Sequence, residues 1–245
     1  MRLTRLYTPR PLATGTVVSL DERAARHCAR VLRMRSGDAV ILFNGEGGEY
    51  QAHLTRIART TVDAEVGEYH DVSRESPLHI TLHQALARGE RMDYALQKAV
   101  ELGVATLAPV ITRRCVVQLD AGKLEKRMAH WRGVIISACE QSGRTRLPRL
   151  LVPQPLAELV ARPSDELRLV LSPTAEQGLS ELQDTGITAV SLLVGPEGGL
   201  EESEIAACVA AGHTALRFGP RILRTETAGT AIIAALQSRW GDLGT

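Results

Sequence analysis

The sequence predicts an α/β protein with two domains: a small β domain comes first, and a larger domain with a parallel sheet follows. Up to about residue 70, apolar and polar residues alternate over short stretches, as they do in half-buried strands. Beyond it, continuous apolar runs alternate with helical stretches, the order typical of a parallel sheet. The polar segment between them contains Ser76 followed by Pro77, which favours an extended linker. We therefore expect domains at residues 1–70 and 78–245, joined by a linker at 71–77.

The composition is that of a globular protein with a sizeable core. The chain has 245 residues, of which 44% are hydrophobic and 23% are charged. We expect a cytoplasmic protein, because no apolar run is long enough to span a membrane and the N-terminus shows no secretory signal. No pair of cysteines forms a Cys-x-x-Cys motif, so neither a zinc site nor a disulfide framework is indicated. We expect no bound metal, and buried thiols at Cys28, Cys115, Cys139 and Cys208.

In the first domain, the alternating pattern predicts strands at residues 38–44, 49–57 and 61–69. The sequence NGEGG at 44–48 is a strong turn signal between the first two strands. A helix is predicted at 21–34, where an acidic first turn precedes an apolar stripe. This stripe consists of Ala25, Cys28, Ala29 and Leu32. The arginines of the helix lie off the stripe, and we expect them to face solvent.

The first 35 residues carry eight arginines and only two acidic residues, a net charge of +6 in a chain whose total is +1. Such a concentration is typical of a surface that binds nucleic-acid phosphates, because arginine forks fit phosphate oxygens. The candidate RNA-binding residues are Arg2, Arg5, Arg10, Arg23, Arg26, Arg30 and Arg33. A solvated face is the alternative, since charge clusters often have no partner. With 3% aromatic residues, a stacking platform for single strands is not expected.

In the second domain, apolar runs predict strands and the stretches between them predict helices. The strands are expected at 78–86, 105–111, 166–172, 187–195 and 213–219. The helices are expected at 92–103, 123–142, 201–212 and 226–240. The last helix is rich in Ala, Ile and Gly on more than one face, which predicts that it packs against a second subunit as well as its own sheet. A helix wholly inside the core is the alternative.

Three of these strands end in unusual loops, at residues 171–173, 195–200 and 218–227. In open α/β sheets, ligands bind beyond the carboxyl ends of the strands. Glycine allows a backbone to approach a ligand closely and to offer its N–H groups. The glycines of these loops are Gly195, Gly198, Gly199 and Gly219.

The loop sequence GPEGG at 195–199 matches neither the dinucleotide-binding pattern nor the P-loop pattern, so no nucleoside triphosphate is expected. The alternative is a plain strand-to-helix turn, followed by acidic residues that stabilise the start of a helix. Two glycine-containing loops at neighbouring strands favour a shared pocket over this alternative.

Four motifs closely resemble the RsmE family of ribosomal RNA methyltransferases. They are KAVELGV at 98–104, ACEQSGR at 138–144, LLVGPEGGL at 192–200 and FGPRILRTETA at 218–228. The N-terminal sequence RLYTPRPL and residues 31–38 also resemble the first domain of that family, so the resemblance spans nearly the whole chain. GPEGG alone would fit other knotted methyltransferases, whereas the combination is specific.

This resemblance implies a homodimeric SPOUT-type enzyme, in which a PUA-like domain precedes a methyltransferase domain with a deep trefoil knot. Chain-topology rules exclude knots by default, so residue patterns alone would not predict one. The implied reaction methylates N3 of one uridine in the decoding region of 16S ribosomal RNA, in the small ribosomal subunit, with S-adenosylmethionine (SAM) as cofactor. The implied cofactor contacts are Leu171, Ser172, Val194, Gly195, Glu197, Gly198, Gly199, Phe218, Gly219, Ile222, Leu223 and Thr225.

The implied reaction also needs groups that act on the uridine. Its N3 carries a weakly acidic proton, and cations near O2 and O4 would stabilise the anion left when that proton is lost. Arg221 and Arg224 are the expected cations, because their loop also contacts the cofactor. Glu140, Arg144 and Glu226 are expected to accept the proton or to orient these arginines. The alternative for Glu140 and Arg144 is an ordinary i,i+4 pair on a helix surface.

Other functions stay open at this point. A knotted methyltransferase of this kind could act on a different RNA nucleotide, because target choice depends on contacts along a folded RNA. The chain could also be an RNA-binding protein without catalysis, or a small-molecule enzyme or nucleotide-binding regulator. His79 and His83 could share one face of a strand, but no carboxylate or cysteine partner is evident, so we expect structural roles.

Overall fold

A computed structural model describes residues 3–58, 61–116, 121–183 and 186–244, without the side chains of Arg30 and Ala121. Contacts divide the chain into two compact units. One unit, here called the β unit, combines Met1–Glu75 with Ile136–Leu147. The other, the α/β unit, combines Ser76–Ile135 with Pro148–Thr245. The sequence pattern placed residues 136–147 in the second domain, whereas the contacts group them with the β unit.

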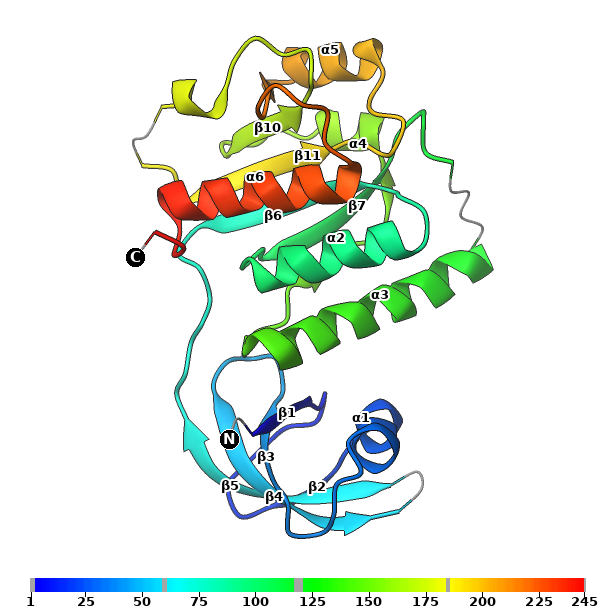
Figure 1. Cartoon of the computed structure of the whole chain (residues 1–245), viewed down its shortest axis with the longest axis vertical. Helices are drawn as coiled ribbons and strands as arrows, with labels where there is room; N and C mark the ends of the chain where they lie inside the picture. Colours follow the sequence, from blue (N-terminus) through cyan, green and yellow to red (C-terminus); the bar gives the residue numbers. More distant parts are fainter. Residues whose placement is uncertain (1–2, 59–60, 117–120, 184–185, 245) are drawn as a thin grey trace. The chain divides into compact units, whose positions relative to one another are not determined.

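Within the described residues, the β unit contains a five-stranded sheet with the order β1-β3-β4-β5-β2 (Figure 1). The strands are β1 Thr4–Tyr7, β2 Val17–Ser19, β3 Ala39–Phe43, β4 Glu49–Ile57 and β5 Val62–His70. β1 and β3 run parallel, and the other neighbours run antiparallel. The three predicted strands, β3 to β5, are confirmed. β1 and β2 were not predicted, because a strand of three or four residues is too short for an alternating pattern to stand out.

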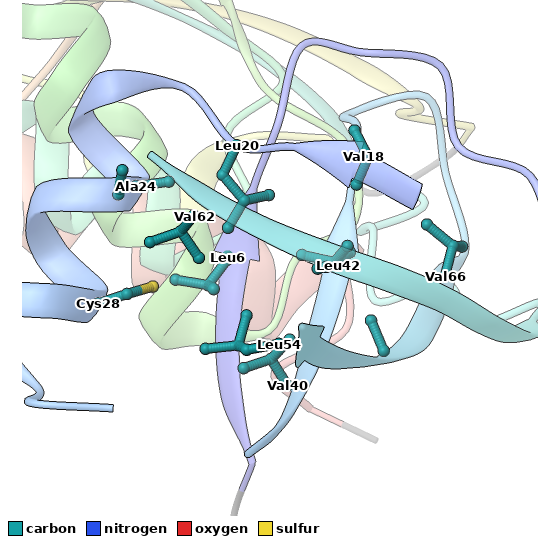
Figure 2. Close-up of a cluster of buried hydrophobic side chains, with 13 residues drawn as sticks. Leu6, Val18, Leu20, Ala24, Cys28, Val40, Leu42, Leu54, Val62 and Val66 are labelled. Atoms are coloured by element: carbon teal, nitrogen blue, oxygen red, sulfur yellow. The ribbon is translucent and has the colours of Figure 1, made fainter. Parts of the chain in front are cut away.

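The strands and helix α1 (Glu22–Arg26) enclose the core of the β unit (Figure 2). Every strand and the helical segment contribute buried side chains to it, among them Leu6, Val18, Ala24, Cys28, Val40, Leu54 and Val62. The helix begins after Asp21, whose carboxylate accepts a hydrogen bond from the backbone N–H of Ala24 at 2.7 Å.

The helix predicted at 21–34 is shorter and less regular than expected. α1 continues as a π-helix at His27–Val31, and the chain leaves the helix at Leu32. A π turn holds more residues than an α turn, so the residues that follow are rotated off the apolar face. Val31 is 67% exposed and Leu32 is 40% exposed, and Leu32 therefore does not complete the predicted stripe.

The described part of the α/β unit contains a seven-stranded parallel sheet, in which the order is β12-β10-β11-β6-β7-β8 and β9 also pairs with β7. Its strands are β6 His79–Ala85, β7 Thr106–Ile111, β8 Arg149–Leu150, β9 Gln154–Pro155, β10 Leu167–Leu171, β11 Ala189–Val194 and β12 Thr214–Leu216. The five predicted strands of this unit are confirmed. The parallel sheet places the carboxyl ends of β10, β11 and β12 side by side.

Helices cover both faces of this sheet. They are α2 Glu90–Glu101, α4 Leu156–Val160, α5 Glu202–Ala210 and α6 Thr225–Trp240, and α3 Ala121–Ser142 begins in this unit. α2 and α6 lie side by side, and α6 contacts β6 and β11 (Figure 1). α4 and α5 pack on the opposite face, where their apolar residues form a cluster with Val110, Val170 and Leu193 of the sheet. None of the described helices combines the length and apolar character that a membrane span requires.

Candidate active site

The loops after β10, β11 and β12 and the start of α6 enclose a cavity of about 330 Å³. This volume is in the range of small-molecule binding sites. The cavity lies within the α/β unit. All of the residues predicted for cofactor contact line it: Leu171, Ser172, Val194, Gly195, Glu197, Gly198, Gly199, Phe218, Gly219, Ile222, Leu223 and Thr225.

One part of the cavity is apolar. Leu171, Val194 and Leu216 end three neighbouring strands and line it together. Ile222 also lines it and exposes 87% of its surface. A flat apolar group bound there would remove this surface from water, which is favourable.

Glycines also line the cavity, and they are needed for two different reasons. Gly199 has a φ of 70° and Gly219 a φ of 74°, in the left-handed region that favours glycine. Gly195 has an ordinary φ, but a Cβ there would lie 3.1 Å from the backbone nitrogen of Leu200. A side chain at Gly195 would therefore crowd the tight turn of the loop at 195–200.

Thr225, the first residue of α6, joins the ends of two strands. Its hydroxyl donates a hydrogen bond to the carbonyl oxygen of Gly195 at 2.5 Å and accepts one from Nε2 of Gln84 at 2.9 Å. Gln84 belongs to β6, and Gly195 follows β11. The side chains of Thr225 and Gln84 are buried, so these hydrogen bonds hold the loop at 195–200, here called the cavity loop, against the sheet without competition from water.

Glu197 fixes the outer part of the same loop. Its Oε1 atom accepts hydrogen bonds from the backbone N–H of Arg88 at 2.9 Å and from Nη1 of Arg91 at 3.2 Å. Partial burial alone would raise the pKa of this carboxyl group, but the hydrogen bonds from Arg88, from its own backbone and from Arg91 outweigh burial and lower the pKa. The carboxylate is therefore ionised and bound to cationic residues.

The predicted catalytic residues do not all lie at the cavity. Arg221 is exposed and lines it. Arg224 is also exposed and precedes α6 as its N-cap residue, but it does not line the cavity. Glu226 lies in the first turn of α6, and its Oε2 atom is buried without a hydrogen-bond partner among the described residues.

Glu140 belongs to the β unit and is fully engaged there. Its Oε1 atom accepts hydrogen bonds from Nη2 of Arg23 at 2.6 Å and from the backbone N–H of Tyr7 at 2.9 Å. Its Oε2 atom accepts a third, from Nη1 of Arg23 at 3.1 Å. This bidentate pair ties the end of α3 to α1 and β1.

Arg144 also belongs to the β unit, and only 4% of its surface is exposed. Its guanidinium pairs with the carboxylate of Glu75, and Nε donates to Oε2 at 3.0 Å. Its carbonyl oxygen accepts a hydrogen bond from Nη2 of Arg5 at 3.1 Å. The alternative of an i,i+4 surface pair between Glu140 and Arg144 is therefore not found, since each pairs with a residue that is distant in sequence.

The predicted RNA-binding arginines differ in their surroundings. Arg10, Arg26 and Arg33 are exposed. Arg5 is buried, with 8% of its surface exposed, and it pairs with Glu49 and stacks on the ring of Phe43. Its assignment to an exposed basic face is therefore wrong, because its guanidinium is used inside the fold. Arg23 is half-buried by its pair with Glu140. Arg2 and the side chain of Arg30 are outside the described residues.

One residue that lines the cavity, Arg114, was not predicted from the sequence. Arg114 follows β7, lines the cavity and donates from Nη1 to the carbonyl oxygen of Gly198 at 2.9 Å. Its aliphatic stem covers Gly198, where a Cβ would lie 3.4 Å from Cβ of Arg114. The rule that ligands bind beyond the carboxyl ends of parallel strands would have found it, had it been applied to the strand at 105–111.

The cysteines take no part in this site. Cys28, Cys139 and Cys208 are buried, and burial raises the pKa of their thiols to about 11, 12 and 11, respectively. Cys115 is half-buried. Among the described residues, no group of three or more His, Cys, Asp or Glu side chains is arranged to hold a metal ion.

Two protein-family models match this chain. Residues 74–237 match the family model described as the RNA methyltransferase domain. Residues 20–67 match the model described as the RNA methyltransferase PUA domain. Fold and site therefore define the class of RNA methyltransferases in which an α/β methyltransferase domain follows a PUA-like β domain.

Similar proteins define the family more narrowly. The ribosomal RNA small subunit methyltransferase E of Buchnera aphidicola subsp. Schizaphis graminum is 35% identical, over 99% of this chain and 98% of its own length. The Bacillus subtilis protein of the same name is 30% identical, over 94% of this chain and 93% of its own. This chain belongs to that family, the RsmE family, and the resemblance seen in its motifs is confirmed.

Two similar solved structures contain a bound cofactor. The ribosomal RNA small subunit methyltransferase E of Neisseria gonorrhoeae, bound to SAM, is 41% identical with a TM-score of 0.92, covering 98% of this chain and 99% of that one. The Legionella pneumophila protein Lpg2936, in complex with SAM, is 39% identical with a TM-score of 0.96, covering 99% of this chain and 100% of that one.

Proposed function

We propose that this protein methylates N3 of a specific uridine in the decoding region of 16S ribosomal RNA, in the small ribosomal subunit, and uses SAM as methyl donor. The observation that carries the proposal is the cavity at the carboxyl edge of the parallel sheet, which all twelve residues predicted for cofactor contact line. Membership of the RsmE family and the SAM-bound relatives support the same reaction.

The residues of the cavity suit SAM in size and chemistry. Leu171, Val194 and Ile222 offer apolar surface to adenine, and the backbone of the loop at 195–200 offers N–H groups to its polar atoms. When bound, SAM supplies an activated methyl group on a sulfonium. Thr225 and Glu197 keep the loop in place, so that the methyl group can be held in line with the attacking nitrogen.

The target uridine must lose the proton on N3 as the methyl group is transferred. We assign to Arg221 the stabilisation of the resulting negative charge on O2 and O4, because it is the predicted catalytic cation that lines the cavity. Arg224 lies three residues further along and supplements it. Glu226, with one carboxylate oxygen buried and unpartnered, is our candidate for accepting the proton or orienting these arginines.

Glu140 and Arg144 receive a different role in this proposal. Both oxygens of Glu140 already accept hydrogen bonds, and Arg144 is buried against Glu75. Neither is free to exchange a proton with a nucleotide in this arrangement. We propose that they are positioning residues, which fix the end of α3 within the β unit.

Three further properties belong to the proposal. The RsmE resemblance implies a trefoil knot in the methyltransferase domain and a homodimer, and a small ribosomal subunit as substrate places the protein in the cytoplasm. The half-buried alanines of α6, Ala231, Ala234 and Ala235, support the homodimer, because small side chains permit close approach of a second subunit.

The proposal is tested by incubating the protein with radiolabelled SAM and small ribosomal subunits that lack base methylation, and mapping the label by mass spectrometry. Label on N3 of one 16S uridine is the expected result. Label on another nucleotide would make this a methyltransferase with a different RNA target. SAM binding without transfer would support a non-catalytic RNA-binding protein, and transfer without RNA would support a small-molecule enzyme.

A further inference from the structure

Besides Arg217, which directly follows β12, six arginines gather at the carboxyl edge of the parallel sheet. Each follows the end of a strand: Arg88 and Arg91 follow β6, Arg113 and Arg114 follow β7, and Arg221 and Arg224 follow β12. Because the sheet is parallel, these strand ends lie along the same edge as the cavity. From β12 to β7 this edge spans four strand spacings, or about 19 Å.

These arginines face solvent. All six are exposed, and the side chains of Arg91, Arg113 and Arg114 have relative exposures of 46%, 68% and 51%. The side chains of Arg88, Arg221 and Arg224 form no hydrogen bond or ion pair with another described residue. Most of the N–H donors on this edge are therefore available to a ligand.

The paired arginines are held in place by the cavity loop and by Glu201, the N-cap residue of α5 that follows it. Arg91 pairs with Glu197, and Arg113 pairs with Glu201 at 3.1 Å. Arg114 donates to the carbonyl oxygen of Gly198 and packs on that glycine. Each contact uses one or two of the five N–H groups of a guanidinium, so it orients the side chain and leaves further donors free.

We propose that these six residues, here called the arginine rim, bind the phosphates of the RNA strand that flanks the target nucleotide. The inference rests on the proposed function and adds a phosphate-binding surface on the methyltransferase domain. An edge of about 19 Å is long enough for several phosphates of one strand. Glu197 and Glu201 pair with Arg91 and Arg113 of the rim. Glu90 and Glu202, exposed in the first turns of α2 and α5, have no such arginine partner among the described residues and disfavour phosphates there. The RNA strand therefore runs along the loops that border the cavity.

A double substitution, Arg88→Gln with Arg113→Gln, tests the rim without changing a residue that lines the cavity. Neither residue lines the cavity, and the hydrogen bonds to Glu197 and Glu204 come from their backbone N–H groups, which the substitutions keep. The ion pair of Arg113 with Glu201, which the variant lacks, is exposed and contributes little to stability. The matched control is Arg149→Gln, an exposed arginine that pairs with Thr106 at the amino end of β7.

The experiment measures binding of unmethylated 16S RNA at several salt concentrations, and SAM affinity by calorimetry. Because the double variant lacks two phosphate-binding cations, the slope of log K against log salt becomes less steep by about 1.4, and affinity at 0.1 M salt falls roughly twenty-fold. SAM affinity stays within about twofold of the wild type, and the control resembles the wild type in both measurements.

Two results would contradict the proposal that the arginine rim binds RNA. One is an unchanged RNA affinity and salt slope in the double variant. The other is a loss of SAM affinity equal to the loss of RNA affinity, which would make these arginines supports of the cofactor loop. The wild-type reaction keeps the two proposals distinguishable: absence of methyl transfer by the wild type contradicts the proposed function, whereas unchanged RNA binding by the variant contradicts only the rim.

Discussion

At the scale of single residues, the side chains around the cavity divide into those that shape it and those that face its opening. Thr225 and Gln84 are buried and hold the cavity loop. Arg221 and Ile222 are exposed, although both line the cavity. Groups that hold the loop need burial to exclude water, whereas groups that act on a large RNA must be reachable from outside.

Arg221→Ala tests the charge-stabilising role. We expect turnover to fall about 100-fold or more while SAM affinity changes little, because the guanidinium acts on charge that develops only during methyl transfer. Single-turnover kinetics and calorimetric SAM binding measure the two effects. Arg217→Ala, at an exposed arginine on the same loop that does not line the cavity, is the control. Equal losses of turnover and SAM affinity would instead make Arg221 a cofactor support.

Because His83 is buried, it should make the stability of the α/β unit depend on pH. Burial lowers the pKa of this side chain from 6.5 to about 4, and the positive charges of His213, Arg168 and Arg162 add to the effect. Above pH 6.5 the histidine is neutral in both states. Between pH 6.5 and 4 the unfolded chain binds a proton that the folded chain does not, so the free energy of unfolding falls, by about 3 kcal/mol in all.

Urea unfolding at pH 7 and pH 4.5, followed by tryptophan fluorescence, measures this loss. Both tryptophans, Trp131 and Trp240, belong to the α/β unit. His83→Gln should lose about 2 to 3 kcal/mol less than the wild type between these pH values, because its side chain does not titrate. His79→Gln is the control, since His79 is exposed on the same strand. A pH dependence equal in His83→Gln and wild type would contradict the assignment.

At the scale of elements, the end of α3 shows how ion pairs can join a helix to a sheet. Glu140 lies on α3, while its partners Arg23 and Tyr7 lie on α1 and β1. The side chain of Glu140 is only 11% exposed, so breaking the pair would leave a poorly solvated charge behind. A catalytic base needs a carboxylate that a substrate can reach, and this one is already bound.

Glu140→Gln distinguishes a positioning residue from a catalytic one. We expect the β unit to lose about 2 kcal/mol of stability, seen as roughly 30-fold faster amide hydrogen exchange in β3 to β5, because Arg23 loses its counterion. The single-turnover rate at saturating RNA should be unchanged. Arg23→Gln should have the same effect, and the double substitution should add little to it. A slower chemical step with normal hydrogen exchange would show that Glu140 acts on the substrate.

At the scale of the whole molecule, the proposed homodimer depends on α6. One side of this helix is buried by its own unit, including Gly229, Ile232 and Leu236, whereas Ala231 and Ala234 are only half-buried. An apolar surface of small residues that is incompletely covered is typical of a subunit interface.

Light scattering after size-exclusion chromatography measures the oligomeric state and tests the proposed homodimer. The wild type should have about twice the mass of one 26.6 kDa chain. Ala234→Arg should be monomeric, because a large charged side chain would be buried in the interface. Ala206→Arg, at an exposed alanine of α5, should remain dimeric. A monomeric wild type, or a dimeric Ala234→Arg, would contradict an interface on α6.

The sequence by itself determined five of the seven strands of the parallel sheet and the location of the cavity. Strand periodicity and helix signals act over a few residues, and the glycines of 195–200 and 218–227 mark strand ends where a backbone meets a ligand. Only the tertiary structure decided the surroundings of the charged residues. It placed Arg5 and Glu140 in buried pairs, shortened the helix at 21–34, and aligned arginines from three separate loops along one edge. Burial and ion pairing depend on partners that lie more than forty positions away in the chain, and no local pattern contains that information.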